Sequence, residues 1–392
     1  MSRPRVLAIV LAGGAGSRLG LLTERRAKPV VPFGGHYRLI DFPLSNCLHS
    51  GISDVWVVMQ FHPGSLSHHL SGGRPWDLDR TTGGLLPVPP HRGDERGGWH
   101  EGTADALWRQ ADRIREHDPD VVVVVSADAV YRMDYDALVS GHLASGALAT
   151  MVTTQVAAAD AGRYGVVVGD GDTVRRYDYK PDRPASDVVS NEVFVFAPSM
   201  LLEELEAVHD EAGPDGLEDL GTRLLPRLVT QGAVRQHRFA DYWRDVGTID
   251  AYWAAHMELL ADPSPFVLDD PRWPVRTAGG TRPPARIDAR AQVSDSLVSG
   301  GARVVGEVEH CVVAPGAVVE AGSYVRDSVL LPGAVVRVNA RVERAILDDH
   351  VEVGADAVVG GPDAISVVGL TGHVTAGSRL EAGTVFPDLT ST

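Results

Sequence analysis

Apolar and polar residues follow two different patterns along the chain, and the change falls near residue 262. Before it, short apolar runs alternate with segments of helical spacing, which predicts a largely parallel α/β sheet with helices on both faces. The predicted strands are Arg5–Ala12, Asp54–Gln60, Asp120–Asp128, Ala147–Val156 and Glu192–Ala197. Thr103–His117 is predicted to form one helix with Thr103 as its N-cap. Residues 72–98, rich in Gly, Pro, Asp and Arg, are expected to be a long mobile loop.

The last part of the chain has almost no helical period and repeats itself. The segments Asp295-Ser-Leu-Val, His310-Cys-Val-Val, Asp327-Ser-Val-Leu and Arg344-Ala-Ile-Leu recur at offsets of 15, 17 and 17 residues (310 − 295, 327 − 310, 344 − 327). Turns of three short strands, about 18 residues each, are typical of a hexapeptide β-helix. A β-sandwich of short strands is the alternative. We therefore expect an α/β domain over residues 1–262, a proline-rich connector over 263–290 and a β-helix over 291–392, which would serve assembly more than chemistry.

Composition narrows the choice of partners. The chain has 392 residues and a formal net charge of −16, which argues against a nucleic acid or an anionic membrane as partner. No apolar stretch approaches the roughly 20 residues of a membrane span, and Cys47 and Cys311 form no CxxC pair. We expect a globular cytoplasmic protein. Of the 36 basic residues, only Lys28 and Lys180 are lysines. Codon bias explains most of the arginine excess, but some phosphate sites accept the compact charge of Lys and not the wide fork of Arg.

A glycine loop follows the first predicted strand and reads Leu11-Ala-Gly-Gly-Ala-Gly-Ser-Arg18-Leu. Small residues there let backbone N–H groups approach phosphates, although a plain tight turn explains the glycines equally well. The dinucleotide fingerprint fails because Leu19 stands at its third glycine, and no Gly-Lys-Ser/Thr of a Walker A motif follows. Four cations accompany the glycine loop, namely Arg18, Arg25, Arg26 and Lys28. Their position beside the loop favours triphosphate binding.

Longer motifs make the chain resemble the ADP-glucose pyrophosphorylase (glucose-1-phosphate adenylyltransferase) family over nearly its whole length. They include Gly13-Gly-Ala-Gly-Ser-Arg-Leu, Arg26-Ala-Lys-Pro, Gly102-Thr-Ala-Asp-Ala, Tyr242-Trp-Arg-Asp-Val-Gly-Thr and Trp273-Pro-Val-Arg-Thr. The resemblance implies a Rossmann-like nucleotidyltransferase domain with a mixed, mainly parallel sheet, followed by a left-handed parallel β-helix of hexapeptide repeats. It also implies an enzyme that uses Mg²⁺ and forms a homo-tetramer or a dimer. In the implied reaction, a sugar 1-phosphate attacks the α-phosphorus of a nucleoside triphosphate and pyrophosphate leaves.

The resemblance also assigns site residues. The catalytic residues would be Arg18, Lys28, Asp128 and Asp245, and the two aspartates would bind the metal. Asp128 also closes a Val-rich run, where an acidic side chain would emerge at the carboxyl edge of the sheet, the usual ligand side. The nucleotide-binding residues would be Leu11, Gly13, Gly14, Gly16, Gln60, Gly102, Thr103 and Asp105, with Gln60 on the base. The sugar-phosphate residues would be His100, Gly165, Tyr179, Lys180, Ser190, Glu192, Asp219 and Trp243.

The departures from the family's pattern lie mainly on the sugar side. Its Glu-Lys-Pro appears as Tyr179-Lys-Pro, and its Ser-Met-Gly-Ile-Tyr appears as Ser190-Asn-Glu192-Val-Phe, so one carboxylate is missing and another is new. We therefore favour a nucleotidyltransferase with an altered acceptor, such as the valienol-type seven-carbon cyclitol phosphates of antibiotic biosynthesis. One alternative is an ordinary glucose-1-phosphate adenylyltransferase for α-glucan synthesis. The other, a non-catalytic regulatory subunit, is disfavoured because decay would strike Asp128, Asp245 and Lys28 as readily as the sugar side. ATP and GTP both stay open.

Overall fold

The computed structural model describes residues 3–91, 97–213 and 216–387, and the chain divides into two compact units. Unit 1 comprises residues 1–14 and 42–243, and unit 2 comprises residues 15–41 and 244–392. Each unit therefore combines segments that are far apart in the sequence. The domain boundaries expected near residues 262 and 291 were inferred from changes in residue composition and pattern, and they stay a prediction.

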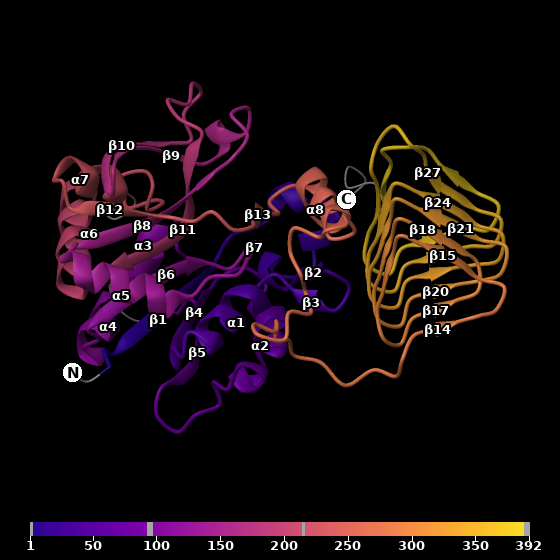
Figure 1. Cartoon of the computed structure of the whole chain (residues 1–392), viewed down its shortest axis with the longest axis horizontal. Helices are drawn as coiled ribbons and strands as arrows, with labels where there is room; N and C mark the ends of the chain where they lie inside the picture. Colours follow the sequence, from indigo (N-terminus) through magenta and orange to yellow (C-terminus); the bar gives the residue numbers. More distant parts are fainter. Residues whose placement is uncertain (1–2, 92–96, 214–215, 388–392) are drawn as a thin grey trace. The chain divides into compact units, whose positions relative to one another are not determined.

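A nine-stranded mixed sheet forms the centre of unit 1, in the order β5-β4-β1-β6-β11-β8-β12-β10-β9 (Figure 1). The strands are β1 (Val6–Ala12), β4 (Asp54–Met59), β5 (Gly84–Val88), β6 (Val121–Ser126), β8 (Ala149–Gln155), β9 (Gly165–Asp170), β10 (Thr173–Tyr179), β11 (Val188–Phe196) and β12 (Val234–Arg238). Neighbours from β5 to β6 pair in parallel, whereas β11 is antiparallel to both β6 and β8. Every strand predicted from the sequence is present, which confirms the α/β fold.

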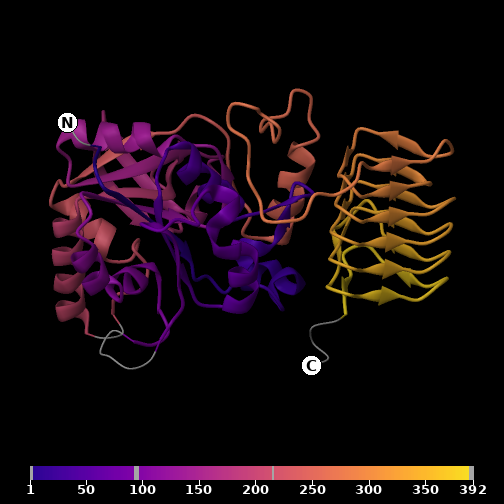
Figure 2. The ribbon, with the colours of Figure 1, turned by 90° about the horizontal axis from the view of Figure 1, so that it is seen from below.

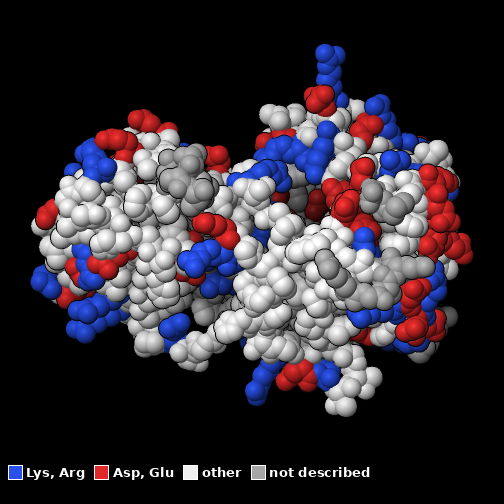
Figure 3. Space-filling view, turned by 180° about the vertical axis from the view of Figure 1, so that it is seen from behind, with Lys and Arg blue, Asp and Glu red and all other residues white. Residues whose placement is uncertain are grey.

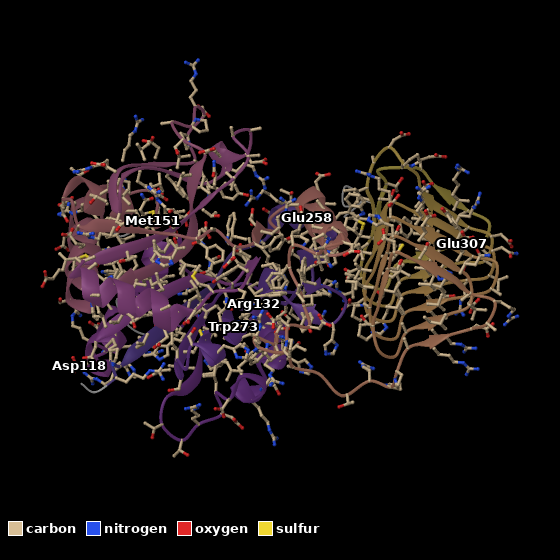
Figure 4. The ribbon with its side chains drawn as sticks, in the orientation of Figure 1. Asp118, Arg132, Met151, Glu258, Trp273 and Glu307 are labelled. Atoms are coloured by element: carbon tan, nitrogen blue, oxygen red, sulfur yellow. The ribbon has the colours of Figure 1, made fainter. Side chains whose placement is uncertain are left out.

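Helices flank this sheet, so its central strands are buried. They are α1 (Asp41–His49), α2 (Pro63–Leu70), α3 (Thr103–Trp108), α4 (Ala111–His117), α5 (Tyr135–Ser145), α6 (Pro198–Ala212) and α7 (Leu224–Thr230). The five consecutive valines of β6 are fully buried, as a strand covered on both faces requires. Met151 of β8, which Figure 4 labels within the sheet, is buried as well.

Two local predictions are wrong. The segment Thr103–His117 forms two helices, α3 and α4, and the residue before α3 is Gly102 rather than Thr103. The Thr103 hydroxyl forms hydrogen bonds with Asp219 and Leu220 instead, and so does not cap the helix. The segment 72–98 is also not a loop throughout, because β5 pairs in parallel with β4, placing Leu85 opposite Val55. Within that segment, residues 92–96 lie outside the described residues.

Unit 2 contains a left-handed parallel β-helix made of three six-stranded sheets, whose stacked coils are visible in Figures 1 and 2. The first sheet holds β14 (Arg286–Ile287), β17 (Arg303–Val304), β20 (Val318–Val319), β23 (Val335–Val336), β26 (Glu352–Val353) and β29 (His373–Val374). The second holds β15 (Gln292–Ser294), β18 (Glu307–Glu309), β21 (Tyr324–Arg326), β24 (Arg341–Glu343), β27 (Val358–Gly360) and β30 (Arg379–Leu380). The third holds β16 (Leu297–Val298), β19 (Val312–Val313), β22 (Val329–Leu330), β25 (Ala345–Leu347), β28 (Ser366–Val368) and β31 (Val385–Phe386).

The register of the β-helix follows the sequence repeat. Leu297, Val312, Val329 and Ile346 are successive partners, and these are equivalent positions of the four repeated segments. The residues that open those segments, Asp295, His310, Asp327 and Arg344, all have positive φ values of 45, 52, 47 and 48°. Residues other than glycine rarely adopt this left-handed conformation, so the repeat encodes a turn as well as a strand. The β-sandwich alternative is wrong.

Unit 2 also contains residues 15–41 and, before the β-helix, α8 (Ile249–Glu258). Trp253 of α8 donates a hydrogen bond from Nε1 to the Asp327 carbonyl at 2.7 Å, and the Arg344 guanidinium lies 4.3 Å from the Trp253 ring centre. Figure 4 labels Glu258 on α8 and Glu307 on β18. These contacts fix α8 against one corner of the β-helix.

Charged side chains of both signs are interspersed over the face seen in Figure 3. Among the residues that the structure describes, no helix is both long enough and apolar enough to span a membrane.

Candidate active site

The predicted cationic residues lie in unit 2, in the segment that follows β1. This segment folds into two short 3-10 helices, η1 (Ser17–Thr23) and η2 (Lys28–Val30). Gly16 has a φ of 68°, and a Cβ on it would lie 2.9 Å from Thr23 Cγ2 and 3.0 Å from Lys28 Cβ. The Thr23 hydroxyl donates to the Gly16 carbonyl at 2.9 Å. Glycine is thus required at residue 16 both for its conformation and for the close passage of Lys28.

Three of the four predicted catalytic residues are close together in unit 2. Lys28 Nζ lies 3.9 Å from Asp245 Oδ1, and the two side chains are only 7% and 16% exposed. Asp245 ends the short strand β13 (Trp243–Asp245). Gly247 stands beside both Asp245 and Arg18, since a Cβ on it would lie 3.1 Å from each Asp245 carboxylate oxygen and 3.4 Å from Arg18 Nη2. Sequence reasoning did not name Gly247, although its place in the Tyr242-Trp-Arg-Asp-Val-Gly motif was a usable signal.

The fourth catalytic residue, Asp128, lies in unit 1, two residues after the end of β6. The Ser126 hydroxyl donates a hydrogen bond to its carboxylate. Leu11, at the end of the neighbouring strand β1, is the register partner of Ser126, so the glycine loop and Asp128 leave the same edge of the sheet. A Cβ on Gly14 would meet no atom within 4 Å, whereas one on Gly13 would touch Gln60 at 3.8 Å. The carboxyl edge of the parallel strands, where ligands usually bind, thus carries Asp128, as its place after the Val-rich strand predicts.

Gln60 and His100 are held together at the end of β4. The Gln60 amide donates to the His100 carbonyl at 3.0 Å and accepts from the His100 backbone N–H at 2.5 Å. Burial lowers the pKa of His100 and outweighs the Asp105 charge, which acts in the opposite direction. His100, predicted to bind the sugar phosphate, is therefore in contact with Gln60, predicted to bind the base.

Asp219 is the centre of the predicted acceptor side in unit 1. Its Oδ1 accepts hydrogen bonds from the Thr103 backbone N–H at 3.1 Å and the Thr103 hydroxyl at 3.3 Å. The same hydroxyl accepts from the Leu220 N–H at 2.9 Å, which explains why Thr103 is no helix cap. Gly102 allows this approach, because a Cβ on it would lie 2.2 Å from the Glu218 carbonyl carbon. Predicted nucleotide and sugar residues are thus joined through one carboxylate.

Tyr179 occupies the other oxygen of Asp219. Its hydroxyl donates to Asp219 Oδ2 at 2.7 Å and accepts from Lys180 Nζ, also at 2.7 Å. Burial raises the pKa of Tyr179, and the hydrogen bond to Asp219 raises it further, so this hydroxyl stays protonated. The ring packs on Gly221, where a Cβ would lie 2.2 Å from Tyr179 Cδ2. In this arrangement the phenol is bonded to two groups that the family resemblance assigns to the acceptor.

Glu192 lies on a bulge of β11 and has a φ of 62°, a conformation that costs free energy for any residue except glycine. Its backbone N–H donates to the Ser190 hydroxyl at 3.3 Å. After burial, the Glu192 charge is the largest factor that raises the pKa of Tyr177, and it also acts on Tyr179. The Glu192 carboxylate is therefore close to the two tyrosines. Sequence reasoning missed Tyr177.

The remaining predicted residues have structural contacts. A Cβ on Gly165 would lie 2.1 Å from the Tyr177 hydroxyl, and Trp243 packs edge-on against Tyr164 with ring centres 5.4 Å apart. Asp105 is buried, accepts from the Glu101 N–H at 2.9 Å and forms an ion pair with Arg109 at 2.8 Å. Over residues 3–91, 97–213 and 216–387, no group of three or more His, Cys, Asp or Glu side chains could hold a metal ion.

Comparison with known proteins identifies similar chains. The family model described as "Nucleotidyl transferase" matches residues 7–262, and the model described as "GlmU-like, C-terminal hexapeptide" matches residues 283–365. The glucose-1-phosphate adenylyltransferase of Thermotoga neapolitana is 42% identical over 82% of this chain and 76% of its own length. The enzymes of the same name from Halalkalibacterium halodurans and Fervidobacterium nodosum are 39% and 36% identical, over 82% and 91% of this chain and 84% and 85% of their own lengths.

Proposed function

The chain belongs to the glucose-1-phosphate adenylyltransferase family and is a sugar-1-phosphate nucleotidyltransferase, and from this premise we propose that it uses ATP and an altered acceptor. A phosphate oxygen of the acceptor attacks the α-phosphorus of the triphosphate, and the bond to the pyrophosphate leaving group breaks. ATP is favoured over GTP by the names of the relatives, which are all adenylyltransferases.

The residues of unit 2 supply the charges that this transfer needs. Nucleotidyl transfer depends on positioning and on charge neutralisation rather than on a covalent nucleophile. Lys28 and Arg18 are cations close to Asp245. The Lys28 side chain is buried and passes close to Gly16, so the turn at Gly16 fixes the position of the ammonium. We assign Lys28 and Arg18 to the triphosphate oxygens, where they stabilise the charge that builds up on the leaving pyrophosphate.

Asp128 of unit 1 and Asp245 of unit 2 each offer carboxylate oxygens of the kind that Mg²⁺ takes beside water and substrate phosphates, and the family resemblance assigns both to the metal. When bound, Mg²⁺ neutralises phosphate charge and polarises the reacting phosphoryl group. The hydrogen bond from Ser126 orients the Asp128 carboxylate.

The altered acceptor rests on one observation, the chain of hydrogen bonds from Lys180 through Tyr179 to Asp219. A family acceptor would need Lys180 and Asp219 for its phosphate and hydroxyls, but the Tyr179 phenol already bonds both. The phenol also offers an aromatic face to a flat, unsaturated ring, and Glu192 adds a carboxylate nearby. These features favour a valienol-type cyclitol phosphate.

Glucose 1-phosphate is the second candidate acceptor, and the printed names of relatives at 36–42% identity favour it. In that case Tyr179 must leave Asp219 when the substrate binds. The two acceptors are distinguished by measuring pyrophosphate release with ATP or GTP in the presence of either glucose 1-phosphate or the cyclitol phosphate. The product of each reaction is identified by ³¹P NMR. The proposed reaction predicts a new diphosphate diester and stoichiometric pyrophosphate. If no triphosphate and acceptor pair yields both products, the proposed function is wrong.

We also propose a homo-tetramer, because a repeat wall with open ends favours association between subunits. Light scattering at micromolar concentration tests this. A monomeric mass would contradict it.

A further inference from the structure

Arg26 connects the segment that carries Lys28 to the β-helix. Its Nη2 donates to Asp348 Oδ1, and its Nη1 lies 3.1 Å from Asp349 Oδ2. Both aspartates directly follow β25 in the β-helix. The Arg26 side chain is 11% exposed, Asp348 is 0% exposed and Asp349 is 18% exposed. We call these three residues the Arg26 clamp.

The clamp also holds its own segment. Arg26 Nε donates to the Leu22 carbonyl at 3.0 Å, so a single guanidinium bridges η1 and the β-helix. The neighbouring Leu21 packs on Gly369 of the β-helix, where a Cβ would lie 3.0 Å from Leu21 Cδ1. The segment of residues 15–28 is therefore attached to the β-helix at two points that lie next to each other in sequence.

The Arg26 clamp buries charged groups, which is an unfavourable way to stabilise a fold. Burial alone would lower the pKa of Arg26, but Asp348 and Asp349 outweigh it and leave that pKa above its ordinary value, so the guanidinium is charged. Among the described residues, Asp348 Oδ2 and Asp349 Oδ1 are buried without a hydrogen-bond partner. Buried ion pairs often contribute little net stability, because desolvation offsets their attraction, and their best-attested use is to fix one geometry. This points to a role in positioning.

Lys28 is the group that this geometry would fix. It follows Arg26 by two residues and opens η2, and its side chain passes Gly16 to reach a point 3.9 Å from Asp245. A shift of Arg26 moves the start of η2 and with it the ammonium. Misplacement of a substrate-positioning group by about 1 Å can cost on the order of 100-fold in rate.

We propose that Asp348 and Asp349 are positioning residues for the triphosphate, which act through Arg26 on the place of Lys28. This inference rests on the proposed function, because it takes Lys28 as the triphosphate lysine. It gives the β-helix a part in the chemistry beyond the assembly role expected from its sequence.

The test replaces each aspartate by its amide and separates the two substrates. Asp349→Asn and Asp348→Asn are expected to raise the KM for ATP by about tenfold and to change the acceptor KM by less than about twofold. Asp349 is more exposed than Asp348, and the contact of Trp253 with the β-helix does not depend on it, so we expect Asp349→Asn to fold. If Asp348→Asn does not fold, Asp349→Asn alone tests the inference.

Glu352→Gln is the matched control. Glu352 also pairs with an arginine of the β-helix, Arg337 at 2.8 Å, but this pair lies outside the Arg26 clamp. Its KM for ATP should equal that of the wild type. Circular dichroism and thermal midpoints of all variants fix a common assay temperature at which each is fully folded.

An unchanged KM for ATP in folded Asp349→Asn overturns the inference, and so does an equal rise in both KM values, which a merely structural role would produce. Titration calorimetry with Mg-ATP separates this result from a failure of the proposed function. If the wild type binds Mg-ATP but releases no pyrophosphate, the proposed function fails, and the affinity ratio between wild type and Asp349→Asn still tests the clamp.

Discussion

Lys28 and Lys180, the two lysines of the chain, lie in contrasting surroundings. Lys28 is 7% exposed and close to the Asp245 carboxylate, in a segment that matches the family's motifs. Lys180 is exposed, has a φ of 47° and donates to the phenol of Tyr179, where the family has a glutamate. The nucleotide side thus keeps a cation with a carboxylate, whereas the acceptor side pairs its cation with a neutral hydroxyl. This contrast is the basis for our proposal that the chain differs from its family on the acceptor side and not on the nucleotide side.

The largest effect is expected from the two aspartates. Asp128→Asn and Asp245→Asn should each lower kcat by at least ~100-fold in Mg²⁺, on the scale of removing one electrostatic contact to the transition state. Pyrophosphate release under saturating substrates measures this. Asp170→Asn, which alters an exposed ion pair with Arg175, is the control and should keep wild-type turnover. Near-normal kcat in both active-site variants would reject the metal assignment.

Lys28→Arg tests the nucleotide side of the comparison. The stem of Lys28 passes within about van der Waals reach of Gly16, and a planar fork cannot replace a point charge in so tight a turn. We expect kcat/KM for ATP to fall by about 30-fold, which corresponds to roughly 2 kcal/mol. Steady-state kinetics with ATP varied at fixed acceptor measures the loss. Wild-type values would mean that codon bias explains the lysine.

Lys180→Arg tests the acceptor side and should have a smaller effect. Because Lys180 is exposed, the larger guanidinium fits without a clash, but it loses the short contact to the Tyr179 hydroxyl. We expect the acceptor KM to rise by about tenfold while the KM for ATP stays constant. An equal rise in both would show that the two lysines do not serve separate substrates.

Two glycines of unit 1 test the packing through stability rather than through turnover. Gly102→Ala would place a Cβ 2.2 Å from the Glu218 backbone, whereas Gly14→Ala would meet nothing within 4 Å. Urea unfolding should show Gly102→Ala to be destabilised by about 2 kcal/mol. Gly14→Ala should keep the wild-type stability and lose affinity for ATP, because its open side is assigned to the nucleotide. Equal stability of both variants would contradict the packing described here.

Repetition and long motifs made much of this architecture predictable. The offsets of 15, 17 and 17 residues between repeated segments gave the β-helix register, since each repeat pairs with the next. The apolar runs predicted β1, β4, β6, β8 and β11, because strands buried in the centre of a sheet form continuous apolar segments, whereas β9 and β10 were missed. Arg18, Lys28 and Asp245 came from motifs, and the structure gathers them in unit 2.

Contacts between distant segments could not be read from local patterns. Thr103 looked like a helix cap because nothing near it in sequence reveals Asp219 and Leu220, over a hundred residues later, as partners of its hydroxyl. The Arg26 clamp likewise joins residues 322 and 323 positions apart. β5 was missed because its Gly- and Pro-rich flanks hide a short edge strand that β4 completes.

The measurement that tests the central claim most directly is kcat/KM of the wild-type enzyme for glucose 1-phosphate, set against a valienol-type cyclitol phosphate, with ATP in both. Because a site built for one hydroxyl pattern leaves its polar groups unpaired with another, we predict a preference of about 100-fold or more for the cyclitol phosphate. The double variant Tyr179→Glu with Glu192→Gly should recover part of the glucose 1-phosphate activity. A wild-type kcat/KM for glucose 1-phosphate near ~10⁵ M⁻¹s⁻¹, an ordinary enzyme value, would contradict the altered acceptor.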